Sequence, residues 1–389
     1  MAPILLCYWV VPNAPSACRP SGVFVIAEAG VNHGGDPALA ERLVEAAAEA
    51  GADAVKFQTF AAERLVTGQA EKAPYQCATT GPGGQLDMLR ALELPPECHA
   101  HLRSRAHGLG LEFLSTPFDI ASLDFLISQV GVPRIKLGSG EITHGALLLA
   151  AACTDRPIIL STGMSTLEEV ADALAVISYG VVQGGPPPSL GACRELAATP
   201  EARSALARRV TLLHCTSQYP APLDDVHLRA MGTLRERFGL PVGYSDHTEG
   251  IATPTAAVAL GACMIEKHFT LCRALPGPDH RASLEPADFA AMVSAVRATE
   301  RALGTAAKML TRGEQPVQSV ARRSLVAARP IRRGETLAPD AMIAKRPAGG
   351  CSPLRIWDLC GRPASRDYEP DEPIAEQVAL QRVAGGGVG

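Results

Sequence analysis

Short apolar runs alternate with helical patterns from Val23 onward. Asp36 can cap the first helix, with Pro37 at its first position, and Ser165 precedes a later stretch with apolar residues at helical spacing. Eight strand–helix alternations predict an α/β fold of the (β/α)8 TIM-barrel type, with a doubly wound open sheet as the alternative. The apolar runs are Val23–Ala27, Ala54–Phe57, Leu111–Leu114, Arg134–Leu137, Pro157–Leu160, Val210–Leu213, Leu240–Tyr244 and Ala262–Ile265.

Polar side chains lie at or just after the end of every run. Because the carboxyl ends of parallel strands lie on the same side, these groups should gather at one end of a barrel, where barrel enzymes have their active sites. Side chains alternate along a strand, so Lys56 and Gln58 should face away from Phe57, and Glu266 should share a face with His268. In order, the polar clusters are Glu28 with Asn32-His33, Lys56 with Gln58, Ser115-Thr116 with Asp119, Lys136 with Ser139 and Glu141, Ser161-Thr162, His214 with Thr216-Ser217 and Tyr219, Ser245-Asp246-His247, and Glu266-Lys267-His268.

Two histidines, His247 and His268, each lie just past one of the last two runs. If these runs are adjacent parallel strands, both imidazoles lie on the same rim, where they could bind a divalent metal. The chain has ten histidines, so the pair alone is weak evidence for a metal site and depends on this convergence.

A second group of residues predicts a site for a small phosphate-bearing anion. The turn Gly138-Ser139-Gly140 lacks the lysine and hydroxyl spacing of a phosphate loop, but its backbone N–H groups can still face an anion. Lys136 precedes this turn, and Lys56 lies on a nearby rim. The alternative is that each lysine is an ordinary solvated charge, because burial of an unpaired ammonium is costly. The hydroxyl groups expected on the same rims are those of Thr116, Ser161 and Thr162.

Two motifs that look like hydrolase sites are not interpreted as such. His214 and Cys215 are neighbours on a strand and should point in opposite directions, so they are not expected to form a Cys/His dyad. The consecutive residues of Ser245-Asp246-His247 cannot stack into one hydrogen-bonded relay, and no nucleophile elbow is present.

Charge and cysteine content narrow the class of protein. The net charge of −4 argues against nucleic-acid binding. Residues 301–389 carry 14 Lys and Arg against 9 Asp and Glu, whereas residues 1–300 carry 22 against 31, so the tail could dock on an acidic face of its own body or of a partner; an ordinary solvated basic surface is the alternative. The 11 cysteines include no C-x-x-C pair, which favours a reduced, cytoplasmic protein.

The pattern predicts four segments. Residues 1–22 begin with an apolar run too short to span a membrane and are interpreted as an extension, with a processed signal as the rival. Residues 23–303 form the barrel, 304–322 a linker and 323–385 a small domain in which residues 331–338 and 368–375 are similar to each other, followed by a frayed Gly-rich end. Within the barrel, the long loop 61–84 could cover the mouth, and residues 179–209 insert a loop and a surface helix.

Nine motifs in order along the chain point to a family. They are AEAGVNHGG at Ala27, VKFQTF at Val55, STPFD at Ser115, KLGSGE at Lys136, LSTGMS at Leu160, LHCTSQYPAP at Leu213, GYSDHT at Gly243, EKHFT at Glu266 and GPDHRASLEP at Gly277. Together they resemble the sialic acid synthase family, which includes bacterial N-acetylneuraminate, legionaminate and pseudaminate synthases. The resemblance covers residues 23–385, and the tail resembles the antifreeze-like (SAF, β-clip) domain of these enzymes.

The resemblance implies a reaction and an assembly. Such enzymes condense phosphoenolpyruvate with N-acetylmannosamine or a related acetamido sugar, releasing phosphate and forming a nonulosonic acid. They are (β/α)8 barrels, use a divalent metal such as manganese or magnesium, and form homodimers in which the SAF domain of one chain caps the barrel of the other. No nucleic acid and no membrane are expected as partners.

The resemblance also implies residue roles. His247 and His268 would bind the metal, and Glu28 would face the sugar aldehyde and the attacking water. Ser217 stands where some members have Asn, which leaves its contact near the phosphate in doubt, and Arg346 of the tail would reach the sugar's N-acetyl group across the dimer. Lys56, Thr116, Lys136, Ser139 and Ser161 would hold phosphoenolpyruvate, and Gln58, Tyr219 and Asp279 would line the substrate site.

Three alternatives remain open from the sequence. The sugar could be a 2,4-diacetamido-trideoxy sugar, as in legionaminate or pseudaminate synthesis, because discrimination depends on pocket shape around its fourth and sixth carbons. Lys56 or Lys136 could form a Schiff base in an aldol reaction, although this explains neither the histidines nor the tail. The chain could also be a barrel that binds a sugar without turnover.

Overall fold

The structure, a computed structural model, describes residues 22–375. It divides into two compact units, Met1–Gly304 and Thr305–Gly389. Apart from Gly22, the predicted N-terminal extension and the Gly-rich end lie outside the described residues. Within the described part of the chain, no helix is both long and apolar enough to cross a membrane.

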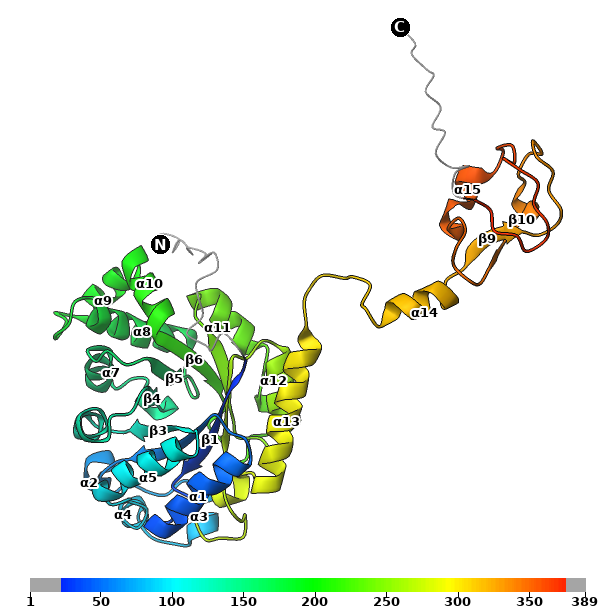
Figure 1. Cartoon of the computed structure of the whole chain (residues 1–389). Coiled ribbons are helices and arrows are strands. Elements are labelled where there is room, and N and C mark those ends of the chain that lie inside the picture. The colour runs from blue at the N-terminus through cyan, green and yellow to red at the C-terminus, as the bar shows by residue number, and fades with distance from the viewer. Residues whose placement is uncertain (1–21, 376–389) are drawn as a thin grey trace. The chain divides into compact units, whose positions relative to one another are not determined.

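Eight parallel strands form the sheet of the first unit, in the order β3-β2-β1-β8-β7-β6-β5-β4. The first strand pairs with the last, and β3 and β4 lie against each other, so the sheet curls into a nearly closed barrel. Helices surround it (Figure 1). The predicted (β/α)8 barrel is therefore confirmed and the open sheet is excluded. The strands are β1 Phe24–Gly30, β2 Ala54–Thr59, β3 Glu112–Pro117, β4 Ile135–Leu137, β5 Ile158–Ser161, β6 Val210–Cys215, β7 Val242–Asp246 and β8 Met264–His268.

Most strands continue past the end of the apolar run that predicted them. The run Leu240–Tyr244 corresponds to β7 Val242–Asp246, and the run Ala262–Ile265 to β8 Met264–His268. The hydrogen-bonded ladder does not depend on side-chain polarity, whereas the apolar pattern stops where the barrel interior becomes polar. Several of the predicted polar residues therefore belong to the strands themselves.

The helices that cover the barrel begin with the expected capping chemistry. The Asp36 side chain accepts a hydrogen bond from the backbone N–H of Ala38, as predicted. The later helix is capped by Thr166, one residue after Ser165, because Thr166 and Glu169 exchange reciprocal hydrogen bonds. These helices are α1 Pro37–Glu49, α5 Pro96–Gly108, α6 Ile120–Phe125 with a π-turn at Leu126–Val130, α7 Gly145–Ala152, α8 Leu167–Val182, α11 Ala230–Phe238, α12 Ala252–Ala259 and α13 Pro286–Leu303.

Two segments interrupt the barrel repeat. The segment after β2 contains three short helices, so the predicted loop 61–84 is partly helical. The predicted insertion at 179–209 begins within α8 and adds two helices that pack against α8. The bounds of these elements are α2 Ala62–Leu65, α3 Pro74–Thr80, α4 Gln85–Arg90, α9 Leu190–Ala197 and α10 Pro200–Arg209.

The alternation of side chains along the strands separates two apolar layers. Phe57 belongs to the large core between strands and helices, while Lys56 and Gln58 face the barrel interior, as predicted. The barrel interior has its own small apolar cluster, which closes the barrel below the polar residues. The members of this cluster are Phe24, Ile26, Ala54, Leu114, Ile159, Leu213 and Met264.

The second unit is a small β-rich domain with an apolar core. Strands β9 Ser324–Ala327 and β10 Met342–Lys345 pair antiparallel, and the short helix α15 Ile356–Leu359 contributes Leu359 to the core. The two similar segments meet directly, since Ile331 and Tyr368 exchange backbone hydrogen bonds of 2.9 Å. Before this domain, α14 Glu314–Ala321 occupies the predicted linker and buries none of its residues.

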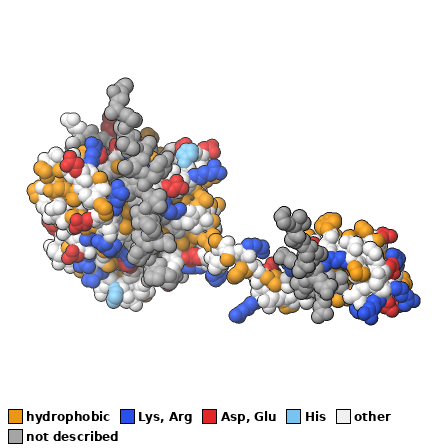
Figure 2. Space-filling view, turned by 90° about the horizontal axis from the view of Figure 1, so that it is seen from above, with side chains coloured by type: hydrophobic (Ala, Val, Ile, Leu, Met, Phe, Trp, Pro, Cys, Tyr) orange, Lys and Arg blue, Asp and Glu red, His pale blue; other side chains and the backbone are white. Residues whose placement is uncertain are grey.

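The second unit exposes several large apolar side chains. Leu354 is 83 % and Trp357 is 79 % exposed, and Val317 and Val320 of α14 are exposed as well. Figure 2 shows acidic and basic side chains interspersed over both units on the visible face. Docking of this domain on a neighbouring surface stays a prediction, to which these apolar side chains add weight.

The close packing of β7 against its neighbours gives a test of the barrel. A Cβ at Gly243 would lie 2.5 Å from the carbonyl oxygen of Met264 and 2.7 Å from Leu213 Cδ2. Gly243→Ala should therefore lower the free energy of unfolding by about 2 kcal/mol, measured by urea denaturation. The control is Gly232→Ala in α11, where the added Cβ meets nothing within 4 Å. Equal stability of the two variants would contradict the packing described for β7.

Candidate active site

A cavity of about 500 Å³ lies at the carboxyl ends of the strands. The strands and the segments that follow them contribute its polar residues, and the segment between β2 and α5 contributes Tyr75, Gln85 and Leu89. The predicted cover over the barrel mouth is therefore present as part of the cavity wall. The cavity brings together these residues predicted from the sequence: Glu28, Lys56, Gln58, Thr116, Lys136, Ser139, Ser161, Ser217, Tyr219, His247 and His268.

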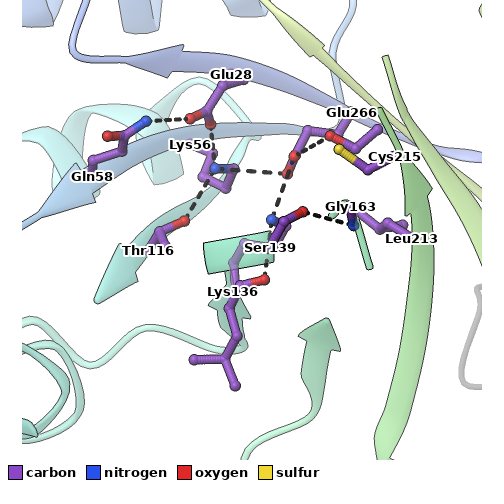
Figure 3. A network of polar contacts seen from close by, with 12 residues as sticks. Glu28, Lys56, Gln58, Thr116, Lys136, Ser139, Gly163, Leu213, Cys215 and Glu266 are labelled. Atoms are coloured by element: carbon purple, nitrogen blue, oxygen red, sulfur yellow. Dashed lines mark hydrogen bonds and ion pairs between the residues drawn. The ribbon is translucent and has the colours of Figure 1, made fainter. Parts of the chain in front are cut away.

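Four buried charges form the centre of the site. Lys56 Nζ lies 2.5 Å from Glu28 Oε2 and 3.7 Å from Glu266 Oε2, and Lys136 Nζ lies 3.5 Å from Glu266 Oε1. Figure 3 shows Lys56 between the two carboxylates. The four side chains are at most 6 % exposed, so their charges compensate one another in place of water.

The two carboxylates differ in their proton affinity. Burial raises the pKa of Glu28 to about 7, although Lys56 acts in the opposite direction. Burial would also raise the pKa of Glu266, but Lys136 and Lys56 outweigh it and hold this pKa at about 2. Glu28 can therefore exchange a proton near neutral pH, while Glu266 remains a fixed anion. Gln58 Nε2 donates to Glu28 Oε1 at 3.2 Å and orients that carboxyl group.

Hydroxyl groups line the cavity beside the lysines. Lys56 Nζ donates to Thr116 Oγ1 at 3.1 Å, and Ser139 Oγ accepts from the backbone N–H of Gly163 at 3.0 Å. The Oγ atom of Ser161 is buried without a hydrogen-bond partner among the described residues. Ser217 lies so close to Gly163 that a side chain added at position 163 would collide with Ser217 Oγ. Buried polar atoms are normally satisfied, so the orphaned hydroxyl indicates a place for a polar ligand.

The two predicted metal ligands lie side by side. Their imidazole centroids are 5.2 Å apart. Nδ1 of His247 lies 2.6 Å from the carbonyl oxygen of Thr216, which accepts its hydrogen and leaves Nε2 available as a metal ligand. Nδ1 of His268 is buried without a hydrogen bond among the described residues and lies 3.8 Å from Asp279 Oδ2. Imidazole nitrogens suit a divalent metal, but among the described residues no group of three or more His, Cys, Asp or Glu side chains is placed to hold one, so these two would supply only part of a ligand set.

Aromatic rings cover the histidines. The ring of Tyr219 lies 4.2 Å from that of His247 and 5.5 Å from that of His268, measured between centroids. Tyr75 of α3 stacks on Tyr219 at 5.3 Å. Asp279 is buried behind this group, and burial raises its pKa to about 6. Helix α3 thereby attaches the covering segment to the side of the cavity that holds the two histidines.

The match to known families agrees with this arrangement. The NeuB family model matches residues 43–308, more than half of the chain, and the SAF domain model matches residues 322–377. The chain belongs to the NeuB family. The resemblance inferred from the nine motifs is confirmed, and so is the SAF domain at the C-terminus.

Two bacterial synthases and one crystal structure are similar to most of this chain. The N,N'-diacetyllegionaminic acid synthase of Campylobacter jejuni is 43% identical over 353 residues, covering 90% of this chain and 98% of that protein. The synthase of the same name from Legionella pneumophila is 46% identical over 341 residues, covering 87% and 89%. A crystal structure of N-acetylneuraminic acid (sialic acid) synthetase from Leptospira borgpetersenii is 32% identical, with a TM-score of 0.63 and coverage of 76% and 90%.

Two predicted site residues are not among those that line the cavity. Arg346 belongs to the second unit, so its proposed reach to a sugar stays a prediction. Asp279 does not line the cavity wall, but it lies beside His268. The side chains of His214 and Cys215 point in different directions, as predicted. His214 Nε2 donates a hydrogen bond to the carbonyl oxygen of Val226, away from Cys215.

Sequence reasoning missed several residues of the site. Glu266 was expected to share a face with His268 but was given no role, although its position two residues earlier places it in the same cavity. Cys215 lies 3.7 Å from His247 Nδ1, a contact between different strands that sequence spacing cannot show. Tyr75 lies in a segment without a strand or long helix to orient it, so no signal predicted its position.

Removing one carboxylate from the charge network should destabilise the barrel. Glu266→Gln leaves Lys136 without the carboxylate it pairs with, so the free energy of unfolding should fall by about 3 kcal/mol at pH 7. The control is Glu372→Gln, which breaks an exposed pair with Arg366 and should change stability little. Urea denaturation of both variants measures the difference. A Glu266→Gln variant as stable as the control would contradict the compensation described here.

Proposed function

We propose that the chain condenses phosphoenolpyruvate with the aldehyde form of an acetamido sugar, releasing phosphate and forming a nonulosonic acid. The proposal rests on the composition of one cavity. It contains two buried lysines and the Ser161 hydroxyl, which has no hydrogen-bond partner among the described residues, and two adjacent imidazoles lie beside them. The first group suits a small phosphate-bearing acid, and the second suits a metal that activates an aldehyde. The relatives named above support a product of this class.

Phosphoenolpyruvate would bind at the lysine side of the cavity. Lys56 and Lys136 would pair with its phosphate and carboxylate as point charges. Ser161 supplies a hydroxyl that has no hydrogen-bond partner among the described residues. Thr116 and Ser139 stand beside the lysines, within the same wall.

The charge balance supports a divalent cation. Lys56 and Lys136 already pair with Glu28 and Glu266, so these four groups offer little excess positive charge to a multiply negative substrate, even with Glu28 partly protonated near neutral pH. His247 and His268 would hold a divalent metal such as Mn²⁺ or Mg²⁺. When bound, that metal would supply positive charge and polarise the sugar aldehyde.

The bond-forming and proton-transfer steps would use side chains of this chain. The methylene carbon of phosphoenolpyruvate attacks the aldehyde carbon, which forms the new C–C bond and leaves an electron-poor second carbon. The aldehyde oxygen takes up a proton and becomes a hydroxyl group. A water molecule adds to the electron-poor carbon and loses one proton, and its second proton leaves as the C–O bond to phosphate breaks, so that a keto acid and inorganic phosphate are formed. Glu28 has a pKa of about 7 and can accept the water's proton, while Gln58 holds its orientation.

We favour a deoxygenated sugar over N-acetylmannosamine as the substrate. The segment between β2 and α5 and the end of β3 give the cavity an apolar wall. A methyl group at the sixth carbon would match this wall better than a hydroxyl group, because apolar surface cannot satisfy the hydrogen bonds of a hydroxyl. An acetamido group at the fourth carbon could place its methyl end on the wall, while its N–H and C=O would need polar partners elsewhere in the cavity. The wall consists of Leu65, Val66, Leu89 and Phe118. We therefore favour a 2,4-diacetamido-trideoxy sugar and keep N-acetylmannosamine as the second candidate.

The alternatives have less support. A Schiff base needs a neutral amine. Burial acts to lower the pKa of Lys56, but Glu266 and Glu28 outweigh it and raise this pKa, which disfavours the reaction at Lys56. Burial lowers the pKa of Lys136, so Lys136 is the better candidate for a Schiff base, but that reaction would leave the two adjacent histidines without a role. A barrel that only binds sugar would not need the perturbed carboxylate of Glu28.

We also propose a reducing, cytoplasmic setting for the protein. We further propose a homodimer in which Arg346 of one chain reaches the barrel of the other.

Phosphate release tests the proposed reaction. The protein should release phosphate from phosphoenolpyruvate only when an acetamido sugar and Mn²⁺ or Mg²⁺ are both present. With both sugars supplied, mass spectrometry should show mainly the diacetamido product. His247→Ala should remove at least about 99% of the activity, because a metal ligand is lost, while circular dichroism remains unchanged. Phosphate release that is independent of sugar, or full activity of His247→Ala, would contradict the proposal.

Mixing two variants tests the exchanged domain. Arg346→Ala alone should mainly raise the KM for the sugar, and His247→Ala alone should be inactive. After unfolding and refolding together, a mixed dimer would combine an intact barrel with an intact Arg346 from the other chain. A statistical mixture should then show about a quarter of wild-type activity at low sugar concentration. Activity no higher than that of the separate variants would place Arg346 outside the other chain's site.

A further inference from the structure

An ion pair lies on the outer side of the barrel wall, behind the two histidines. Lys267 Nζ lies 2.6 Å from Asp246 Oδ2, and both side chains are 0 % exposed. Neither residue lines the cavity, so neither binds the substrate directly. Burial of an ion pair carries a large desolvation penalty and contributes little to stability compared with apolar residues of similar size. A contribution to stability therefore does not explain why the Asp246–Lys267 ion pair is buried here.

The ion pair holds the chain on both sides of His247. Asp246 precedes this histidine, and Thr248 follows it. Lys267 Nζ donates both to Asp246 and to the carbonyl oxygen of Thr248. Asp246 Oδ1 in turn accepts from the backbone N–H of Thr248 at 2.9 Å and from the hydroxyl of Tyr244 at 3.1 Å. The backbone at His247 is thus tied to a single ammonium group.

The same ammonium group belongs to the residue before His268. Asp246 and Lys267 are register partners on β7 and β8, so each histidine follows one member of the pair. On the inner side, Ser245 Oγ donates to Glu266 Oε1 at 2.8 Å, which links the preceding register pair. The two strands are therefore connected on both faces at their ends. A slip of one residue would turn His268 toward the outer layer.

We propose that Asp246 and Lys267 are positioning residues that set the separation and orientation of the two imidazoles and thereby the metal affinity. The inference rests on the metal site of the proposed function. The pair acts through the backbone: it holds the two strand ends in register and holds the turn after His247 against β8. Outer groups that orient metal ligands typically change metal affinity by about 10–100-fold when they are removed.

Metal binding by the full chain tests the positioning role. Mn²⁺ affinity can be measured by electron paramagnetic resonance titration of the metal-free protein, without substrate. Lys267→Met should weaken Mn²⁺ binding by at least about tenfold. Asp246→Asn keeps the size of the side chain but removes the charge, and it should act in the same direction. The spectrum of bound Mn²⁺ should also change, because the two nitrogen ligands no longer hold a fixed separation.

A less buried ion pair at the opposite end of the barrel is the control, with side chains 30 % and 14 % exposed. Arg297 lies 2.6 Å from Asp53, which precedes β2, on the side away from the cavity. Arg297→Met should lower the melting temperature and leave Mn²⁺ affinity unchanged. The double variant Asp246→Leu/Lys267→Met replaces the pair by apolar side chains, so it should recover melting temperature lost by Lys267→Met and still bind Mn²⁺ weakly.

The outcomes separate this inference from the proposed function. If the wild-type protein binds Mn²⁺ and the Asp246 and Lys267 variants bind it equally well, the pair is structural and the inference is wrong. If the wild-type protein binds no Mn²⁺, the metal assignment fails and the inference with it. If Lys267→Met does not fold, Asp246→Asn and the double variant decide. Loss of Mn²⁺ affinity in Arg297→Met as well would show a general effect of stability and overturn the inference.

Discussion

The site depends on the mutual compensation of charges that the barrel removes from water. Two ammonium groups and two carboxylates share the interior at the carboxyl ends of the strands, where each alone would be strongly unfavourable. Compensation is unequal: Glu266 faces both lysines and stays ionised, whereas Glu28 faces one and is poised near neutral pH. One buried network therefore provides both a fixed anion that holds the lysines and a group able to accept a proton.

Parallel strands turn a simple alternation of side chains into two separate chemical layers. On β7 and β8, the inward residues Ser245, Glu266 and His268 belong to the cavity, while the intervening residues Asp246 and Lys267 form an ion pair in the outer layer. The two layers share one register, so a contact on the outside constrains a distance on the inside. Barrel geometry thus couples residues that never touch a ligand to those that do.

The two units contribute differently to the proposed reaction. The barrel unit by itself contains the lysines, the hydroxyl groups and both histidines to which the proposal assigns the bond-forming chemistry. The second unit offers Arg346 and exposed apolar side chains such as Trp357, which suit a docking surface.

The sequence determined the barrel, the strand ends as the position of the site, and most of the site's polar residues. It could do so because side-chain alternation and the polar ends of strands are local properties, visible at Lys56 and Gln58 or at Glu266 and His268. Only the tertiary structure showed which groups compensate one another. The contact of Cys215 with His247 and the stacking of Tyr75 on Tyr219 join segments far apart in the chain, and such contacts depend on strand order and packing, which carry no local signal.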